Sequence, residues 1–304
     1  YSRFFMNALS YKNNNFDLIE PFEGLFTQGM VCHETYKDKD NNWVSPDEIV
    51  IIDGQKFLKK DKTQKVKVGP SESMSKSKKN TIDPKKIIDN FGADAVRLFI
   101  VSDSPAEKDV EWSDEGIEAS FKFIQKLWIM NKKIVDEIQI DNKKNTSNDL
   151  EELISEFVND VQNNLENFRY NKVVANFHEL YGNLSKKNLK KYSSLCLKNN
   201  YVKVLISMMP VIPHFASECL KLLKFNEIIS WPEINKETLI KKYVKYVVQI
   251  NGKTRQIIEE KKDLSEKDLI ILIKKDQQLN KYLNDNIEIK KSIFIPNRLI
   301  NIII

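Results

Sequence analysis

A long stretch of apolar residues at helical spacing, from Ser113 to Trp231, limits the fold more than any other feature of this sequence. Apolar residues here recur three and four positions apart, which places them on one face of a helix. Amphipathic helices of this kind bury their apolar faces against one another, so the stretch predicts a helical bundle. The predicted helices begin at Ile117 and Leu153 and cover Val173–Leu184 and Tyr201–Leu223, with a polar gap at 141–148 and a short connecting segment at 188–200.

The last part of the chain has a strand-like pattern instead. Apolar residues alternate from Val244 to Ile250, and Asn251-Gly252 follows directly. Asn-Gly after an alternating run is typical of a β-hairpin, so 253–259 is the predicted return strand. Together with a later helix and two more strands, this pattern indicates a compact α/β module. The helix is predicted to begin at Ser265, and the two strands at 287–295 and 299–304.

The first part of the chain mixes both kinds of element. A helix is predicted at 1–12, and a small β-rich insertion with polar turns at 32–68. Asp83-Pro84 has the features of a helix start, because Asp can cap exposed N–H groups and Pro is tolerated in the first turn. The expected apolar face of this helix is Ile87, Ile88 and Phe91, Gly92 ends it, and a second helix follows at 94–101 with Ala95, Leu98 and Phe99 inward.

Two charged residues of that second helix are candidates for an ion pair. Asp94 and Arg97 are three positions apart, so they can meet on one helix face. A structural role is therefore predicted for both.

The loop from Ser71 to Asn80 carries three lysines among small residues and follows Gly69-Pro70. A mobile loop with a lysine can close over the phosphates of a nucleotide. Its backbone N–H and ammonium groups stabilise charge that grows as a phosphorus–oxygen bond breaks. The alternative interpretation is a solvated surface turn.

Bulk properties exclude several classes of protein. The length of 304 residues allows two or three domains, and a net charge of +5 does not by itself require a nucleic-acid partner. Three widely spaced cysteines argue against a disulfide framework or structural zinc and favour a reducing cytoplasm. Apolar runs are too short to span a membrane. Because the chain opens with Tyr1, we expect it to be the C-terminal piece of a longer protein.

Within the lysine loop, Met74-Ser75-Lys76-Ser77 resembles the KMSKS signature of class I aminoacyl-tRNA synthetases. Flanking segments narrow the resemblance to the bacterial-type leucyl-tRNA synthetase family, in the family's order and over nearly the whole chain. The first lysine of the signature is replaced by Ser73. The family's HIGH signature and editing domain have no counterpart, so both are expected upstream of Tyr1. The similar segments are 24–31, 42–46, 75–84, 91–99, 248–255 and 296–302.

The resemblance implies a multidomain α+β fold with three parts. Residues 1–112 are expected to form the end of a Rossmann-like class I catalytic domain, with the β-rich insertion at 32–68 and the KMSKS-like loop at 69–84. A helical bundle of the anticodon-binding type is expected at 113–237. A small C-terminal α/β domain that contacts tRNA is expected at 238–304.

The resemblance also implies roles for individual residues. Lys76 is the expected catalytic residue, because the second lysine of the family signature stabilises the departing pyrophosphate, and Lys78 or Lys79 are the candidates to compensate for Ser73. ATP is the expected substrate, with Mg²⁺, and no metal site is identified in the chain. The expected ATP-binding residues are Lys76, Met74, Ser75, Ser77, Gln28, Gly29 and Met30, and the expected tRNA-binding residues are Lys253, Arg255, Arg298, Lys186 and Lys187.

The implied reaction is the ATP-dependent activation of leucine and its transfer to tRNA(Leu), by a cytoplasmic monomer that does not bind membranes. By itself this chain is expected to bind tRNA weakly and to leave leucine unactivated. Two alternatives stay open. One is a sister synthetase for valine, isoleucine or methionine, and the other is a non-enzymatic tRNA-binding module derived from a synthetase.

Overall fold

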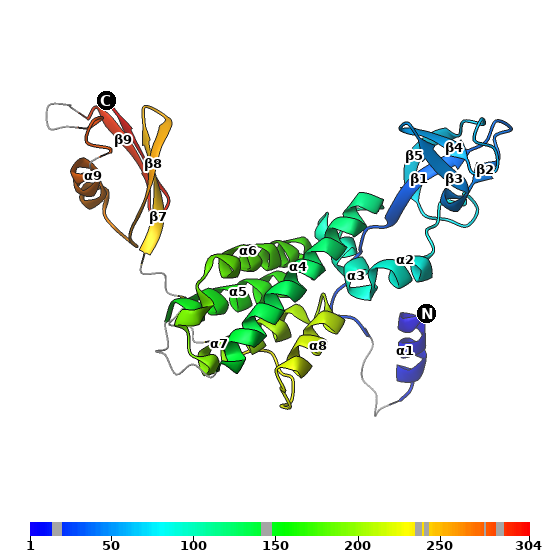
Figure 1. Ribbon diagram of the computed structural model, residues 1–304, viewed down its shortest axis with the longest axis horizontal. Helices are drawn as coiled ribbons and strands as arrows, with labels where there is room; N and C mark the ends of the chain where they lie inside the picture. The colour runs from blue at the N-terminus through cyan, green and yellow to red at the C-terminus, as the bar shows by residue number, and fades with distance from the viewer. Residues whose placement is uncertain (14–19, 141–147, 235–238, 240–242, 277, 284–288) are drawn as a thin grey trace. The chain divides into compact units, whose positions relative to one another are not determined.

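The computed structural model describes residues 1–13, 20–140, 148–234, 239, 243–276, 278–283 and 289–304. The chain forms two compact units, Tyr1–Glu233 and Ile234–Ile304 (Figure 1). Helices and several small sheets share these units, so the predicted multidomain α+β class is confirmed. The predicted boundary at 112 stays a prediction, and the one at 237 lies outside the described residues.

The predicted N-terminal helix is present as α1, Ser2–Ser10. None of its residues is buried, and Phe4 and Phe5 are 79% and 63% exposed. The helix is therefore formed locally, without a packed partner for its apolar face in the described part of the chain.

A small sheet built on strand β1, Val31–Lys37, carries the candidate loop. On one side β1 pairs antiparallel with β5, Lys67–Ser73, which places Cys32 opposite Ser73. It also pairs antiparallel with β2, Trp43–Val44, and parallel with β6, Val110–Glu111. The first residues of the predicted mobile loop, Gly69 to Ser73, are therefore strand, because their backbone groups are paired with β1.

The other strands of the insertion form a separate hairpin. A short 3-10 helix, Pro46–Glu48, leads into β3, Ile49–Ile52, which pairs antiparallel with β4, Gln55–Leu58. Ile49 and Leu58 pack against a small core of Tyr36, Val44 and Val66. The predicted β-rich character of this region is confirmed.

Helix α2, Pro84–Phe91, begins as predicted, because the Asp83 carboxylate accepts a hydrogen bond from the Lys85 backbone N–H at 3.0 Å. Gly92 (φ 81°) separates it from α3, Ala93–Ser102. Ala95 and Phe99 are buried as predicted. The prediction for Ile88 is wrong, since this side chain is 41% exposed, and only Ile87 and Phe91 pack against the cluster around Ala95 and Phe99.

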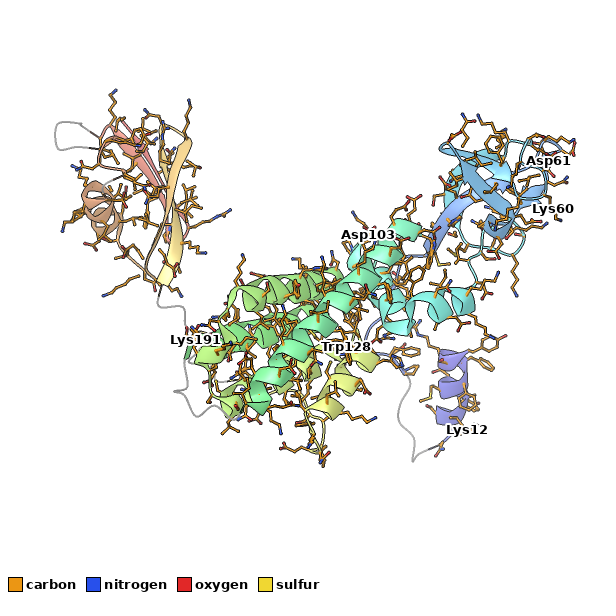
Figure 2. The ribbon with its side chains drawn as sticks, in the orientation of Figure 1. Lys12, Lys60, Asp61, Asp103, Trp128 and Lys191 are labelled. Atoms are coloured by element: carbon orange, nitrogen blue, oxygen red, sulfur yellow. The ribbon has the colours of Figure 1, made fainter. Side chains whose placement is uncertain are left out.

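The helical bundle predicted after Ser113 is present. Trp128 of α4, labelled in Figure 2, packs edge-on against Phe215 of α8 with 6.4 Å between ring centroids. Helix α7 contacts α4, α5 and α8. The helices are α4 at Asp114–Gln139, α5 at Asn148–Glu166, α6 at Tyr170–Lys186, α7 at Ser194–Met208 and α8 at Pro213–Leu222, with a 3-10 turn at Leu189–Lys191.

Two predicted boundaries in the bundle are wrong. The predicted helix Tyr201–Leu223 is two helices, because Pro213 lacks a backbone N–H and starts a new helix instead of continuing the old one. The predicted connecting segment 188–200 already contains the first turns of α7. Ser193 caps this helix by accepting a hydrogen bond from the Cys196 backbone N–H at 3.1 Å.

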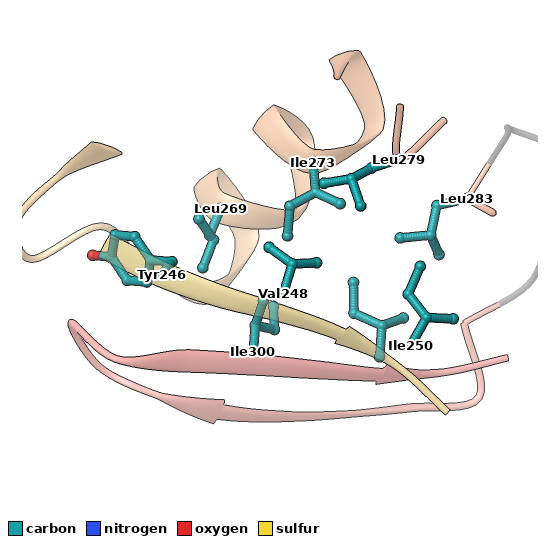
Figure 3. Close-up of a cluster of buried hydrophobic side chains, with 9 residues drawn as sticks. Tyr246, Val248, Ile250, Leu269, Ile273, Leu279, Leu283 and Ile300 are labelled. Atoms are coloured by element: carbon teal, nitrogen blue, oxygen red, sulfur yellow. The ribbon is translucent and has the colours of Figure 1, made fainter. Parts of the chain in front are cut away.

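The second unit is a four-stranded sheet packed against one helix, with strand order β8-β7-β10-β9 and β10 parallel to β7. Asn251 and Gly252 have φ angles of 49° and 75°, as a type I′ turn requires, so the predicted hairpin is confirmed. Figure 3 shows the buried core between sheet and helix, including Tyr246 and Leu269. The elements are β7 at Tyr243–Ile250, β8 at Lys253–Lys261, α9 at Glu266–Lys275, β9 at Lys291–Ile295 and β10 at Leu299–Ile303. The predicted start of the third strand, at 287 and 288, lies outside the described residues.

Candidate active site

The KMSKS-like segment is a tight turn at the end of β5. The Met74 backbone N–H donates to the Val31 carbonyl at 3.1 Å, which continues the pairing with β1. The turn closes with a hydrogen bond from Lys79 N–H to the Lys76 carbonyl at 3.3 Å, and Lys79 has a φ of 54°. Lys76 is exposed at the crest of this turn. Its ammonium group is therefore open to solvent on a segment whose ends are fixed.

The two serines of the signature face each other across the turn. Their hydroxyl oxygens are 3.3 Å apart, and the Ser75 hydroxyl accepts a hydrogen bond from the Lys78 backbone N–H at 3.4 Å. Ser75 is half-buried, whereas Ser77 is exposed. Ser75 thus shapes the turn, and only Ser77 presents its hydroxyl to solvent together with Lys76.

Asn80 holds the base of the turn. Its side chain is only 1% exposed, and its carbonyl oxygen accepts a hydrogen bond from the Ser75 backbone N–H at 2.8 Å. Its amide nitrogen donates to the carbonyls of Glu72 at 3.1 Å and His33 at 3.2 Å. The role of Asn80 is not evident from the sequence, because nothing in a run of polar residues marks one of them as buried.

Lys78 and Lys79, the two candidates to compensate for Ser73, have different surroundings. The Lys78 ammonium group forms an ion pair with the Glu72 carboxylate on β5. Lys79 is exposed, and its left-handed backbone belongs to the turn itself. The charge of Lys78 is therefore paired with Glu72, whereas the side chain of Lys79 is exposed to solvent.

The segment Gln28–Met30, expected to contact ATP, lies just before the first strand of the sheet. The strand begins only at Val31, and both Gln28 and Met30 are exposed. Two hydrogen bonds join the segment to the loop before β6. The Gly29 N–H donates to the Ala106 carbonyl at 2.8 Å, and the Met30 N–H donates to the Asp109 carboxylate at 2.8 Å.

The two segments predicted to bind ATP meet at the start of β1. Met30 precedes Val31, whose carbonyl accepts the hydrogen bond from Met74. On the other side, the Val110 N–H donates to the Met30 carbonyl at 2.9 Å. The structure therefore brings the KMSKS-like turn and the Gln28–Met30 segment to one end of this sheet.

Gly29 is required by a close approach of two backbones. A Cβ atom at this position would lie 2.0 Å from the Lys108 carbonyl oxygen. We expect Gly29→Ala to destabilise the β1–β6 region by about 2 kcal/mol, as overpacking does when a backbone must move. Hydrogen exchange of the 105–112 amides measures the effect. Gly24→Ala is the matched control, because no atom lies within 4 Å of a Cβ there; equal exchange in the two variants would contradict the prediction.

A second polar cluster lies on the insertion, and no sequence motif predicted it. Tyr36 donates its hydroxyl hydrogen to Glu34 at 2.7 Å, and Lys56 forms an ion pair with Glu34. Burial opposes ionisation of Glu34, but the hydrogen bonds from Lys56 and Tyr36 outweigh it, so the pKa of this carboxyl lies below its usual value. Burial, and then the bond to Glu34, raise the pKa of Tyr36 to about 12. The cluster joins β4 to β1 and thereby stabilises the sheet.

The predicted pair of Asp94 and Arg97 does not form. The Asp94 carboxylate accepts a hydrogen bond from the Phe215 backbone N–H at 2.6 Å, and its other oxygen lies 2.9 Å from His214 Nδ1. Arg97 donates to the carbonyls of Pro210 and Val211, at 2.8 and 2.9 Å. Both residues therefore hold α3 against the connection between α7 and α8, because the burial of that connection offers backbone partners closer than the helix neighbour.

The two lysines of the bundle that are predicted to contact tRNA differ in their exposure and charge pairing. Lys186 is exposed, whereas the Lys187 ammonium group lies 2.7 Å from the Asp149 carboxylate. Lys191, labelled in Figure 2, lies 3.0 Å from the same oxygen. The positive charge of this surface is thus partly offset by Asp149.

In the second unit, Lys253, Arg255 and Arg298 are all exposed, as a phosphate-binding role requires. Lys253 lies opposite Ile250 in the sheet. The Arg255 guanidinium lies 4.6 Å from the centre of the Tyr282 ring. The Arg298 carbonyl accepts a hydrogen bond from Val247 on the side of β7 that faces away from β8. Arg298 and Lys253 are therefore roughly 10 Å apart along the strand direction, at about 3.3 Å per residue, and also two strand spacings apart across the sheet. Lys253 and Arg298 therefore do not converge on one point.

Within the described ranges, no three His, Cys, Asp or Glu side chains gather in a way that could hold a metal ion. In the same residues, no helix is both long enough and apolar enough to cross a membrane.

Comparisons with known proteins identify related chains. Residues 66–113 match the family described as tRNA synthetases class I (I, L, M and V), and residues 147–271 match the anticodon-binding domain of tRNA ligase. The leucine–tRNA ligase of Wolbachia pipientis subsp. Culex pipiens (strain wPip) is 39% identical over 311 residues, and that of Zymomonas mobilis subsp. mobilis is 35% identical over 306 residues. These alignments cover 100% of this chain but only 36% and 35% of the relatives, so the chain spans about a third of their length.

A solved structure has a similar fold. The ternary complex of Agrobacterium radiobacter K84 agnB2 LeuRS with tRNA and LeuAMS superposes with a TM-score of 0.68 over 99% of this chain and 36% of that chain. At 22% sequence identity this likeness shows the fold.

Proposed function

Because this chain belongs to the leucine–tRNA ligase family, we propose that it is the part of such a ligase that carries the signature lysine and tRNA-contacting surfaces. In the proposed reaction the leucine carboxylate attacks the α-phosphate of ATP, which gives leucyl-adenylate and pyrophosphate. The leucyl group then passes to the terminal adenosine of tRNA(Leu). Neither step needs a covalent intermediate on the enzyme, so the work of the protein is positioning and charge stabilisation.

The exposed ammonium group of Lys76 is the observation that carries this proposal. It lies on a turn fixed at both ends, beside the Gln28–Met30 segment at the start of β1. A cation held in this way can stabilise the negative charge that develops on the departing pyrophosphate. Ser77 and the exposed side chains of Gln28 and Met30 are the further candidates to contact ATP, whereas Ser75 and Met74 shape the turn.

Mg²⁺ would enter this site on the phosphates of ATP. Glu72 is two residues before Met74, but its carboxylate is paired with Lys78. The described residues therefore offer the ion no ready set of carboxylate ligands. We propose ATP as the substrate and assign no residue of this chain to the metal.

Contacts with tRNA are proposed for exposed cations on both units. Lys186 on the bundle and Lys253, Arg255 and Arg298 on the second unit are exposed, so they can neutralise phosphates, whereas Lys187 must share its charge with Asp149. We propose further that the ligase acts as a monomer in the cytoplasm.

Leucine-dependent exchange between ATP and labelled pyrophosphate tests this function. The full-length protein should exchange with leucine and much less with valine, isoleucine or methionine. The isolated 304 residues should give no exchange and should bind tRNA(Leu) weakly, with an affinity that falls as salt rises. Preferred exchange with another amino acid would identify a sister synthetase. Absence of exchange by the full-length protein with any amino acid would leave a non-enzymatic tRNA-binding module.

A further inference from the structure

Asn80 differs from every other polar residue of the KMSKS-like segment in its burial. Its side chain is 1% exposed, whereas Lys76, Ser77 and Lys79 around it are exposed. A buried carboxamide without partners would be strongly unfavourable. Here both ends of the carboxamide are hydrogen-bonded, so the residue is held in one orientation.

The partners of this carboxamide come from three different segments. Ser75, whose N–H bonds to the Asn80 oxygen, begins the turn. Glu72, which accepts from the Asn80 nitrogen at 3.1 Å, lies on β5. His33, which accepts from the same nitrogen at 3.2 Å, lies on β1. One side chain thus ties both ends of the turn to the two strands beneath it.

The crest of the turn is connected to this base through the backbone. Lys76 lies four residues before Asn80 and one residue after Ser75. Its backbone carbonyl closes the turn to Lys79, and the neighbouring Ser75 N–H is fixed by Asn80. The position of the Lys76 backbone therefore depends on the Asn80 side chain, although the two side chains have separate surroundings.

We propose that Asn80 is a positioning residue for adenylate formation, which sets the direction in which Lys76 presents its ammonium group before the nucleotide arrives. This inference rests on the proposed function of Lys76. A preformed turn avoids the loss of conformational freedom that a flexible lysine loop undergoes when it closes over phosphates. The ion pair between Glu72 and Lys78 acts in the same sense, because it fixes a second side chain of the turn to β5.

The hydrogen-bond partners at position 80 require a side chain that both accepts and donates, as an amide does. The Ser75 N–H needs an acceptor, and the two strand carbonyls need donors. A carboxamide supplies both, whereas an aspartate has no N–H to donate and places negative charge against two carbonyl oxygens. Asn80→Asp keeps the size and the bond to Ser75 but loses the bonds from the amide nitrogen to the strand carbonyls.

A double-mutant cycle between Asn80 and Lys76 in the full-length protein tests the proposal. We expect Asn80→Ala to lower kcat of leucine-dependent pyrophosphate exchange by about 10- to 100-fold, with the KM for ATP changed by less than about 3-fold. In the Lys76→Ala background the same change should lower kcat by less than about 3-fold, because the ammonium group it positions is gone. Asn80→Asp should behave like Asn80→Ala.

A matched control separates positioning from general loss of stability. Asn200 is also a buried asparagine, 8% exposed, whose amide donates to the Cys196 carbonyl at 2.9 Å within α7. Asn200→Ala should lower the thermal midpoint about as much as Asn80→Ala and leave pyrophosphate exchange unchanged. A kcat loss with Asn200→Ala equal to that of Asn80→Ala would overturn the proposal.

The outcomes distinguish this inference from the function on which it rests. If Lys76→Ala lowers kcat and Asn80→Ala lowers it by the same factor in both backgrounds, the coupling is absent and only the role of Asn80 is refuted. The same holds if Asn80→Ala is fully active. If Lys76→Ala is itself fully active, the proposed role of the signature lysine fails, and the role of Asn80 fails with it.

Discussion

Replacement of Lys76 by alanine in the full-length protein should lower the rate of leucine-dependent pyrophosphate exchange by about 100- to 1000-fold. The residue lies on a turn fixed at both ends and is exposed to solvent, as the proposed contact with the phosphates of ATP requires. Its effect is expected in kcat more than in the KM for ATP, because the charge it stabilises develops as the pyrophosphate leaves.

The control for this experiment is a lysine with similar exposure and no place in the turn. Lys62 lies on the polar turn between β4 and β5 and is exposed. Lys62→Ala changes the net charge by the same amount, so it reports any general electrostatic effect on ATP binding. Lys76→Arg should retain part of the activity, since the charge is kept in a different shape. Equal activities of Lys76→Ala and Lys62→Ala would contradict the proposed role.

Elements set by short-range interactions were predictable from the sequence. The start of α2 was predicted from Asp83-Pro84, and the structure shows the cap, because the Asp83 carboxylate bonds to a backbone N–H only two residues away. The β7–β8 hairpin was predicted from Asn251-Gly252, because only residues that tolerate a positive φ fit its turn. In both cases the atoms that decide the structure are neighbours in the chain.

The turn near Pro210 shows where such reasoning fails. Apolar spacing continues through Met209 to Ile212, so periodicity alone predicted one helix across it. In the structure α7 ends at Met208 and α8 starts at Pro213. Proline interrupts a helix even where apolar residues keep the helical period, because it lacks the backbone N–H that continues the helix.

Long-range partners could not be predicted from the sequence, because the residues that meet are far apart in the chain. Asp94 is separated by 120 positions from His214 and by 121 from Phe215, and Arg97 by 113 from Pro210. The helical spacing of Asp94 and Arg97 permits a pair, but the tertiary fold offers each a buried backbone partner instead. The burial of Asn80 and the neutralisation of Lys187 by Asp149 depend on the fold in the same way.

Replacement of Asp94 by alanine should destabilise the packing of α3 on the bundle by about 3 kcal/mol. Its side chain is only 9% exposed. It accepts hydrogen bonds from two backbone N–H groups at the start of α8, that of Phe215 at 2.6 Å and that of His214 at 3.3 Å. Removal of the carboxylate leaves these donors without their acceptor. It also removes a negative charge from the positive end of a helix. Asp94→Asn should lose less, because one oxygen remains to accept.

Hydrogen exchange of the α8 amides in the isolated chain measures the loss of stability at this contact. A local measurement is needed because a chain of two units need not unfold in one step. The Phe215 amide should exchange faster in Asp94→Ala by roughly 100-fold, the factor that corresponds to about 3 kcal/mol. Asp89→Ala is the control, since Asp89 is an exposed acid on α2. If the α8 amides exchange equally in both variants, the carboxylate does not hold the two helices together. The bonds from Arg97 to Pro210 and Val211 would then be the attachment of α3 to the bundle.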